Sequence, residues 1–201
     1  MSILGTLGQV LLVSAIILSL FQVRKYPPFV RWGALGTSAA VGFMKFGDLR
    51  LVAYPSGVLG DLSVTTQILL TAVIVKQVLR IDVLSDRDRA TILFAAAGAG
   101  LVLYPLSSGL MMLDVYSLGF HSTALMLGLA VLAVIGWYLQ PGAAVIVPLG
   151  VIAFNLGLLA SNNVWDYLLD PMLTLFAWGW VLIVVTKRKF SPARLAAVSE
   201  P

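Results

Sequence analysis

The hydrophobic positions of this chain fall into seven long runs that are separated by short polar stretches. Each run approaches the ~20 residues that an α-helix needs to cross the hydrocarbon core of a bilayer. The runs are continuous and do not alternate, which predicts helices and not the strands of a membrane barrel. We expect spans at about 3–22, 29–46, 62–80, 90–106, 122–140, 143–160 and 172–187.

This pattern predicts an all-α integral membrane protein, a bundle of seven transmembrane helices. We place one transmembrane domain at residues 1–190 and a short cytoplasmic tail at residues 191–201. The first run has no basic segment before it and no small-residue cleavage site, so we expect a retained helix and not a cleaved signal peptide. A Leu-Val-x-Tyr-Pro stretch occurs at 51–55 and again at 101–105, which is compatible with one helix followed by three outward hairpins.

The composition supports a membrane environment and excludes several kinds of chemistry. The chain is 60% hydrophobic and 11% charged, with a mean hydropathy of +0.98, which is too apolar for an ordinary soluble domain. It has no cysteine, which excludes disulfides, thiolate metal sites, thiol catalysis and covalent haem attachment. The last run has no lysine in its interior, which argues against a retinal pigment. Whether the chain binds another cofactor stays open on the sequence.

Lysine and arginine are divided unequally between the two sides that seven spans create. Eleven of the thirteen fall on one side, and only Lys45 and Arg50 fall on the other. Because cytoplasmic loops carry the excess of positive charge, we expect the N-terminus outside and the C-terminus in the cytoplasm. This orientation explains the net charge of +4 without a nucleic-acid partner. The predicted cytoplasmic bases are Arg24, Lys25, Arg31, Lys76, Arg80, Arg87, Arg89, Lys187, Arg188, Lys189 and Arg194.

The predicted outer side is acidic and carries the only histidine, His121. A chemical site, if the chain has one, should therefore face outward. A histidine with an acidic partner could act as a base, and oxygen ligands could hold Ca²⁺ or Mg²⁺. The outer carboxylates are Asp48, Asp61, Asp114, Asp166 and Asp170.

Several polar residues next to the runs are typical of helix starts. Asp170 precedes Pro171, and Asp followed by Pro at the first helical position is a strong N-terminal signature. Asp61 and Ser122 hold equivalent positions before the third and fifth runs. Before the fourth run, Ser85 and Asp88 have the spacing of a capping box.

The stretch "NNVWDYLLDP" (162–171) gathers unusual polarity between two apolar runs. If 161–170 is helical, Asn162, Asp166 and Asp170 share one face, and Trp165 and Tyr167 anchor the segment at headgroup level. One interpretation is an interfacial turn with a solvated carboxylate. The other is that Asp166, with Asn162 or Asn163, contacts a cation, a sugar or a lipid headgroup.

Three sets of candidate site residues follow from these patterns. The catalytic candidates are Asp166, His121 and Asp114. The ligand-binding candidates are Asn162, Asn163, Asp166, Asp170 and Tyr116. The metal-ligand candidates are Asp114, Asp166 and Asp170.

Inside the runs, Gln67 and Asn155 are expected to form hydrogen bonds between helices, and Pro148 should kink the sixth helix. Two stretches of small residues, 33–42 and 95–100, suit close helix packing. That packing could lie within the bundle, in self-association, or against another membrane protein.

Three functions remain open on the sequence. The first is a non-catalytic accessory component of a bacterial-type inner (cytoplasmic) membrane, which binds a partner or an envelope lipid through its outer loops. The second is an enzyme acting at the outer interface on a lipid-linked or phospho-substrate, which requires Asp114, His121 and Asp166 to converge. The third is a small transporter, which requires a polar path through Asn155 and Gln67 at the midplane.

Overall fold

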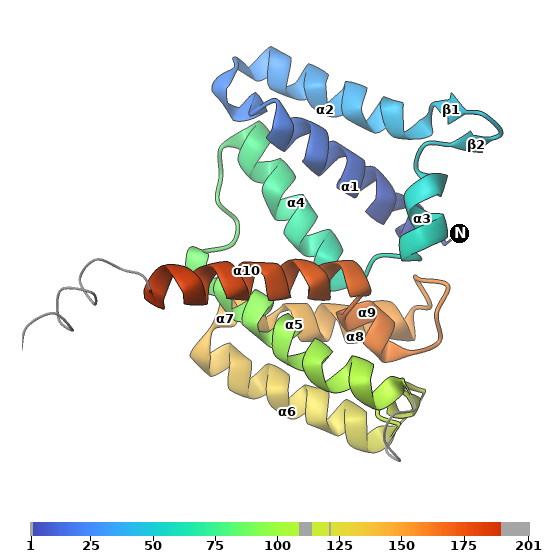
Figure 1. Cartoon of the computed structure of the whole chain (residues 1–201), viewed down its shortest axis with the longest axis vertical. Coiled ribbons are helices and arrows are strands. Elements are labelled where there is room, and N and C mark those ends of the chain that lie inside the picture. Colours follow the sequence, from blue (N-terminus) through green and yellow to red (C-terminus); the bar gives the residue numbers. More distant parts are fainter. Residues whose placement is uncertain (1, 109–113, 121, 190–201) are drawn as a thin grey trace, which may run out of the picture.

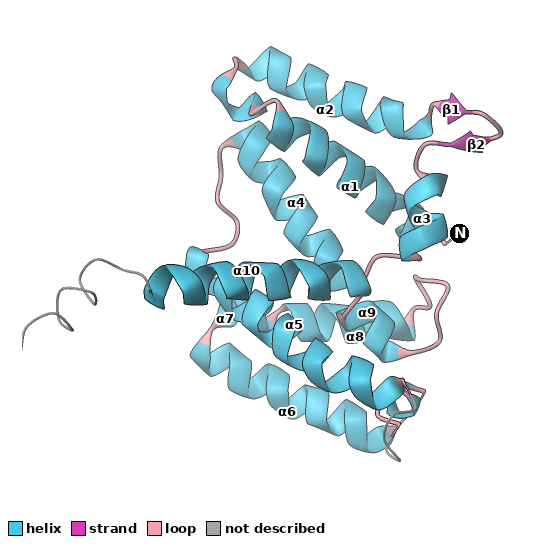
Figure 2. Cartoon of the chain, viewed as in Figure 1, coloured by secondary structure: helices cyan, strands magenta, loops and turns pink. Residues whose placement is uncertain are grey.

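The computed structural model shows a helical chain with one small two-stranded hairpin, as Figure 2 illustrates. It describes residues 2–108, 114–120 and 122–189. The helices lie as rods of similar direction, and their connections gather at two opposite ends of the molecule (Figure 1). The prediction of an all-α chain is confirmed.

The helices coincide with the hydrophobic runs. The seventh run is α10, and the sixth is divided between α7 and α8. The long helices are α1 (Ile3–Leu20), α2 (Pro28–Phe43), α4 (Val64–Leu79), α5 (Asp86–Ser107), α6 (Thr123–Leu139) and α10 (Pro171–Lys189). The shorter elements are α3 (Ala53–Leu59), α7 (Pro141–Ala144), α8 (Ile146–Asn155), α9 (Val164–Leu168), η1 (Val23–Lys25), η2 (Ser117–Gly119), β1 (Lys45–Phe46) and β2 (Leu49–Arg50).

The region after α2 differs from the prediction. The helix ends at Phe43, and the chain then forms the antiparallel hairpin β1–β2, in which Lys45 pairs with Arg50. Gly47, with φ of 65°, occupies the left-handed conformation that this tight turn requires. The short helix α3 follows, where only a loop was expected. The two Leu-Val-x-Tyr-Pro stretches thus adopt different structures, since the second lies in the last turns of α5.

Pro148 explains why the sixth run is not one helix. Proline has no N–H to bond the carbonyl four residues earlier, and its ring collides with that carbonyl. The affected residue is Ala144, where α7 ends, and α8 begins again at Ile146. The helix is thus interrupted next to the carbonyl that Pro148 leaves without a partner, at the place where a kink was predicted.

The helices pack in two groups that α4 connects. In the first group α1 packs against both α2 and α4, while in the second α5 packs against α10 and α6 against α7 and α8. Helix α4 also touches α8 and α9, and the buried cluster of Ala72, Leu84, Ile92 and Ile146 joins the groups. The small residues of 95–100 serve this packing, because Ala96 and Ala97 are buried against α10.

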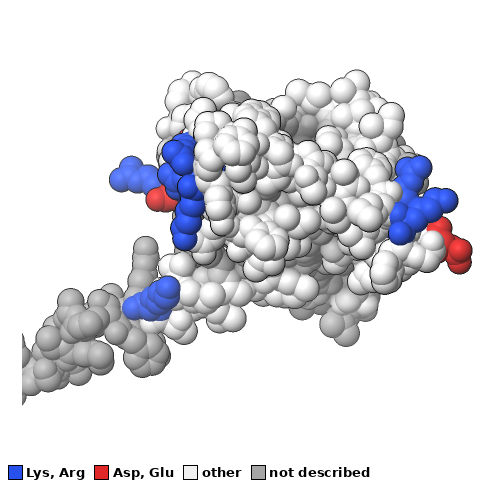
Figure 3. Space-filling model, turned by 90° about the horizontal axis from the view of Figure 1, so that it is seen from above, with Lys and Arg blue, Asp and Glu red and all other residues white. Residues whose placement is uncertain are grey.

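Two ends of the molecule are named here by their contents. The hairpin end holds β1–β2, α3, the start of α1 and the segment before α9, and it corresponds to the predicted outer side. The basic end holds η1, the α4–α5 loop and the α6–α7 turn, and it corresponds to the predicted cytoplasmic side. Figure 3 shows charged side chains gathered at both ends, with an uncharged surface between them on the face displayed.

Much of the uncharged surface consists of exposed large hydrophobic side chains. On α6 only Leu129 is buried, whereas Leu132, Ile135 and Trp137 are at least half exposed. Apolar surface on this scale marks contact with a membrane or another protein. By length and composition, α1 and α5 are long and apolar enough to cross a membrane, and the other apolar helices are shorter. The crossing of all seven helical segments remains a prediction.

We expect single cysteines to report the orientation without background, because the chain has none of its own. Asp48→Cys and Asn162→Cys, both exposed at the hairpin end, should react with a membrane-impermeant maleimide in intact expressing cells. Arg87→Cys, exposed at the basic end, should react only after permeabilisation. Labelling of all three in intact cells, or of Arg87→Cys alone, would contradict an odd number of spans with the N-terminus outside.

Candidate functional site

A cleft of about 400 Å³ opens at the hairpin end and brings three carboxylates together. Its walls come from the end of α3, the segment before α9, and the junction of α9 with α10. Neither lysine nor arginine is among the residues that line it. The lining residues are Leu59, Gly60, Asp61, Leu159, Ala160, Ser161, Asp166, Leu169, Asp170 and Pro171.

Asp170 is a buried carboxylate, 3% exposed, that joins the starts of two helices. Its Oδ1 accepts the backbone N–H of Leu173 at 2.8 Å, which confirms the predicted cap of α10. Its Oδ2 accepts the backbone N–H of Ser63 at 3.0 Å, the Ser63 hydroxyl at 2.6 Å and the hydroxyl of Thr66. Asp170 therefore also closes the start of α4, which lies 107 residues earlier. Its oxygens are occupied by the chain itself.

Asp61 does not cap α4, contrary to the prediction. The cap is Ser63, whose hydroxyl oxygen accepts the backbone N–H of Thr66 at 3.2 Å. Asp61 instead accepts the hydroxyl of Ser2 at 2.9 Å and the backbone N–H of Ala160 at 3.1 Å, so it ties the start of α1 to the segment before α9. This close approach depends on Gly5, because a Cβ there would lie 2.0 Å from Asp61 Oδ1.

Asp166 and Tyr116, both predicted site residues, are brought into contact. Oδ2 of Asp166 accepts the Tyr116 hydroxyl at 2.9 Å and the Ser161 hydroxyl at 2.5 Å. Burial of the phenol, as the larger cause, and its hydrogen bond to the carboxylate together raise the pKa of Tyr116 to about 12. The contact fixes the segment 114–120 against α9.

The predicted alignment of Asn162, Asp166 and Asp170 on one helical face is wrong. Helix α9 covers only Val164–Leu168, and Leu169 is extended. Asn162 is exposed and outside the cleft, whereas Asp170 is buried at the start of the next helix. A single helix does not form here because Leu169 is extended and Pro171, which starts α10, has no N–H to bond the carbonyl four residues earlier.

Asn163 has a structural role. Its side chain is fully buried, and its Oδ1 accepts the N–H of Trp165 at 3.0 Å, which caps α9. Its amide Nδ2 donates to the Tyr116 carbonyl at 2.9 Å. With both ends of the side chain bonded inside the protein, Asn163 is not placed to contact a ligand.

The aromatic residues of α9 also face inward. Tyr167 is fully buried, and its hydroxyl accepts the N–H of Leu159 at 3.1 Å and donates to the Ser161 carbonyl at 3.1 Å. Trp165 donates its indole N–H to the Val115 carbonyl at 3.0 Å. The prediction that Tyr167 anchors the chain at headgroup level is therefore wrong, because its hydroxyl serves loop carbonyls instead of water.

Asp114, a catalytic and metal candidate, does not join the cleft. Asp114 is exposed, accepts the N–H of Ser117 at 3.2 Å and is not a lining residue. His121 lies outside the described residues. Within the described part of the chain, no group of three or more acidic, histidine or cysteine side chains could hold a metal ion. The structure places Asp166 and Asp170 in the cleft but does not bring Asp114, the third residue of the predicted metal set, to them.

Gln67 and Asn155 do not bond between helices as predicted. Gln67 lies in the first turn of α4 and donates to the Leu62 carbonyl at 2.9 Å, while Asn155 ends α8 and donates to the Val151 carbonyl at 2.8 Å. Both lie at the hairpin end instead of the midplane, so they do not form the polar path that a transporter requires.

The sequence reading missed the hydroxyl groups that organise the cleft. Ser2, Ser63 and Ser161 each donate to one of its carboxylates. The only local signal was at Ser63, which precedes Val64 and is followed three residues later by Thr66, in the position of an N-cap. Which carboxylate each of the three serines bonds depends on the fold and could not be predicted from the sequence.

We expect Asp170→Ala to destabilise the protein by about 3 kcal/mol, because it leaves buried donors of two helices without an acceptor. Denaturant unfolding in detergent micelles measures this loss. Asp48→Ala, which removes an exposed carboxylate at the same end, should change the free energy of unfolding by less than ~0.5 kcal/mol. Equal effects of the two substitutions would contradict the double-capping role.

Tyr116→Phe should make stability less sensitive to alkaline pH. The pKa of Tyr116, about 12, lies above its ordinary value of 10.0, so the folded chain keeps a proton that the unfolded chain loses. This contribution is complete below pH 10.0 and is lost as the pH rises toward 12. The melting temperature of the wild type should exceed that of Tyr116→Phe more at about pH 9 than at about pH 11. An unchanged difference would refute the assigned contact.

No protein-family model matches this chain, and neither does any curated protein or solved structure. The geometry of the cleft is therefore the basis for a functional conclusion.

Proposed function

We propose that the protein is a multi-pass component of a bacterial-type inner membrane that binds, without catalysis, an amine-bearing headgroup at its outer face. The binding site is the cleft of the hairpin end. An envelope lipid presents such a headgroup at this level of the bilayer.

The membrane placement is supported by surface chemistry. Exposed leucine, isoleucine and tryptophan side chains cover α6, and charged side chains gather at the two ends (Figure 3). The excess of basic residues at the basic end matches the rule that cytoplasmic loops are positive.

The cleft carries the proposal because its charge is entirely negative and its carboxylates are held in place. Asp61 and Asp166 receive their internal hydrogen bonds on Oδ2. Among the described residues Oδ1 of each accepts no hydrogen bond, and Oδ1 of Asp61 lies against Gly5 of α1. A carboxylate oxygen in this state accepts a hydrogen bond from an ammonium group, and such charge-assisted bonds are the stronger kind.

The arrangement favours binding over the enzyme hypothesis. Asp170 is fully engaged in capping, and Asp114 does not line the cleft. The enzyme hypothesis requires Asp114 to converge with Asp166, and the cleft does not contain Asp114.

Helix α2 supplies a surface for a second membrane protein. An added Cβ at Gly33 or Gly36 would meet nothing within 4 Å among the described residues, whereas one at Gly100 would lie 2.3 Å from Thr174 Cγ2. The small residues of 95–100 are thus covered by α10, while those at the start of 33–42 are not. Uncovered small residues beside exposed Trp32 suit close contact with another transmembrane helix.

Native mass spectrometry in mild detergent tests the headgroup assignment. Phosphatidylethanolamine should remain bound to the wild type more than phosphatidylcholine, whose quaternary ammonium has no N–H to donate. The double variant Asp61→Asn/Asp166→Asn should lose retention of phosphatidylethanolamine by roughly fivefold to tenfold.

The matched control is Asp48→Asn/Asp114→Asn, which removes two exposed carboxylates from the same end outside the cleft. It should retain the lipid as the wild type does. Equal loss in the two double variants, or equal retention of the two lipids, would contradict the proposal. Thermal unfolding of each variant confirms that the compared proteins are folded.

A further inference from the structure

A second cleft, of about 450 Å³, lies at the basic end and has the opposite chemistry. It is formed between η1, with the residue before it, and the end of α4. Every lining side chain is polar, three are cationic and none is acidic. The lining residues are Gln22, Arg24, Lys25, Gln77 and Arg80.

Two strained residues build this cleft. Gln22, with φ of 48°, and Arg80, with φ of 63°, are the non-glycine residues with positive φ in the described part of the chain, and both line the cleft. Side chains other than glycine adopt this conformation at a free-energy cost, and such strain concentrates at functional sites. Both residues thus hold the cleft in a backbone conformation that costs free energy.

The walls of the cleft are tied together by hydrogen bonds. The guanidinium of Arg80 donates through Nε and Nη2 to the Arg24 carbonyl, at 3.1 and 2.9 Å. The backbone N–H of Arg24 donates to Gln77 Oε1 at 3.1 Å. These bonds leave Nη1 of Arg80 and the side chains of Arg24 and Lys25 without an acceptor among the described residues. The cations are thus positioned but not neutralised.

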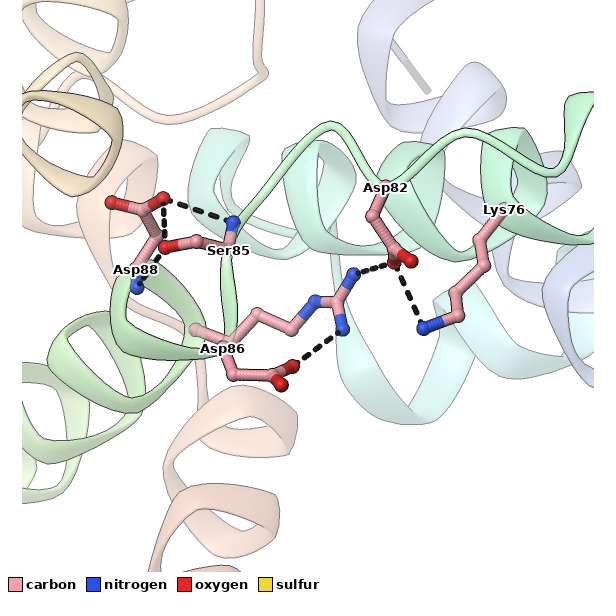
Figure 4. A network of polar contacts seen from close by, with 6 residues as sticks. Lys76, Asp82, Ser85, Asp86 and Asp88 are labelled. Atoms are coloured by element: carbon pink, nitrogen blue, oxygen red, sulfur yellow. Dashed lines mark hydrogen bonds and ion pairs between the residues drawn. The ribbon is translucent and has the colours of Figure 1, made fainter.

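The carboxylates of the basic end interact with residues outside the cleft, as Figure 4 shows. Asp82 accepts Lys76 at 2.8 Å and Arg89 at 2.7 Å, which hold the pKa of Asp82 at about 2. Asp88 forms the predicted capping box with Ser85 at the start of α5. No carboxylate of the described residues forms an ion pair with the cations of the cleft, so these cations are available to an anion from outside the chain.

The surroundings indicate where that anion comes from. Leu20, Phe21 and Tyr26 are 73%, 64% and 49% exposed, and they neighbour the lining residues in sequence. Exposed aliphatic and aromatic side chains next to cations are typical of the membrane–water interface. Arg31 of α2, a helix that contacts η1, does not line the cleft but is only 8% exposed, and its Nε and Nη1 have no partner among the described residues. A buried, unpaired guanidinium is costly without a counterion.

We propose that the basic cleft binds a phosphate group, presented by the headgroup of an anionic lipid in the cytoplasmic leaflet. Arg24, Lys25 and Nη1 of Arg80 hold the phosphate oxygens, while Leu20, Phe21 and Tyr26 lie against the acyl-chain boundary. The assignment rests on the membrane placement of the proposed function, but not on the amine-binding cleft at the other end.

Retention of phosphatidylglycerol in native mass spectrometry tests the proposal. The double variant Arg24→Gln/Lys25→Gln should reduce retention roughly tenfold or more, because each basic residue near a membrane surface strengthens binding to anionic lipid several-fold. The matched control is Lys45→Gln/Arg50→Gln, which removes the same charge from the hairpin end. The control should retain phosphatidylglycerol as the wild type does.

A third arm separates the two sources of phosphate. Inorganic phosphate should neither raise the melting temperature of the wild type nor displace phosphatidylglycerol. If it does both, the site binds free phosphate and the lipid assignment is overturned. Equal loss in both double variants, or unchanged retention in Arg24→Gln/Lys25→Gln, overturns the site itself. Because the outer cleft is tested with another lipid and other variants, either proposal can fail while the other stands.

Discussion

The structure of the hairpin end depends on the hydrogen bonds that the Asp170 carboxylate accepts from the starts of α4 and α10. A buried charge is tolerated only when its acceptor positions are filled, and here the starts of α4 and α10 supply the donors. Beside it, the Thr65 hydroxyl donates to the Leu168 carbonyl at 2.6 Å, so the same two regions meet twice. The position of Asp166, and with it one wall of the cleft, follows from where these helix starts are held.

The helices themselves could be predicted from the sequence because their causes are local. Long apolar runs decide where helices lie, and caps such as Ser85 with Asp88, Ser122 and Asp170 act within one turn of the helix they start. Pro148 acts on a carbonyl four residues earlier. The hairpin escaped prediction because its first strand, β1, lies inside the predicted second span, and α3 because it lies between the predicted second and third spans, where only a loop was expected.

The site could be predicted only in part, because its contacts join distant segments. Asp166 and Tyr116 were both candidates, but nothing local says that they touch, since they lie 50 residues apart. Asp61 resembled a helix cap, yet its donors come from Ser2 and Ala160. Tyr167 resembled an interfacial aromatic, yet loop carbonyls and amides bind its hydroxyl. A single sequence shows which hydrogen bonds a side chain can form, whereas the fold determines which distant residue is its partner.

Helix α10 has a consequence for how the protein is assembled. Its Trp178 donates to the Ala97 carbonyl at 3.0 Å across 81 residues, and Thr174 packs on Gly100. During synthesis, α4 and α5 are made before α10. The donors at the start of α4 and the small-residue surface of α5 therefore have no partner until α10 is complete. The second group of helices can therefore close only as a late step, when α10 inserts beside α5 and delivers the acceptor for the start of α4.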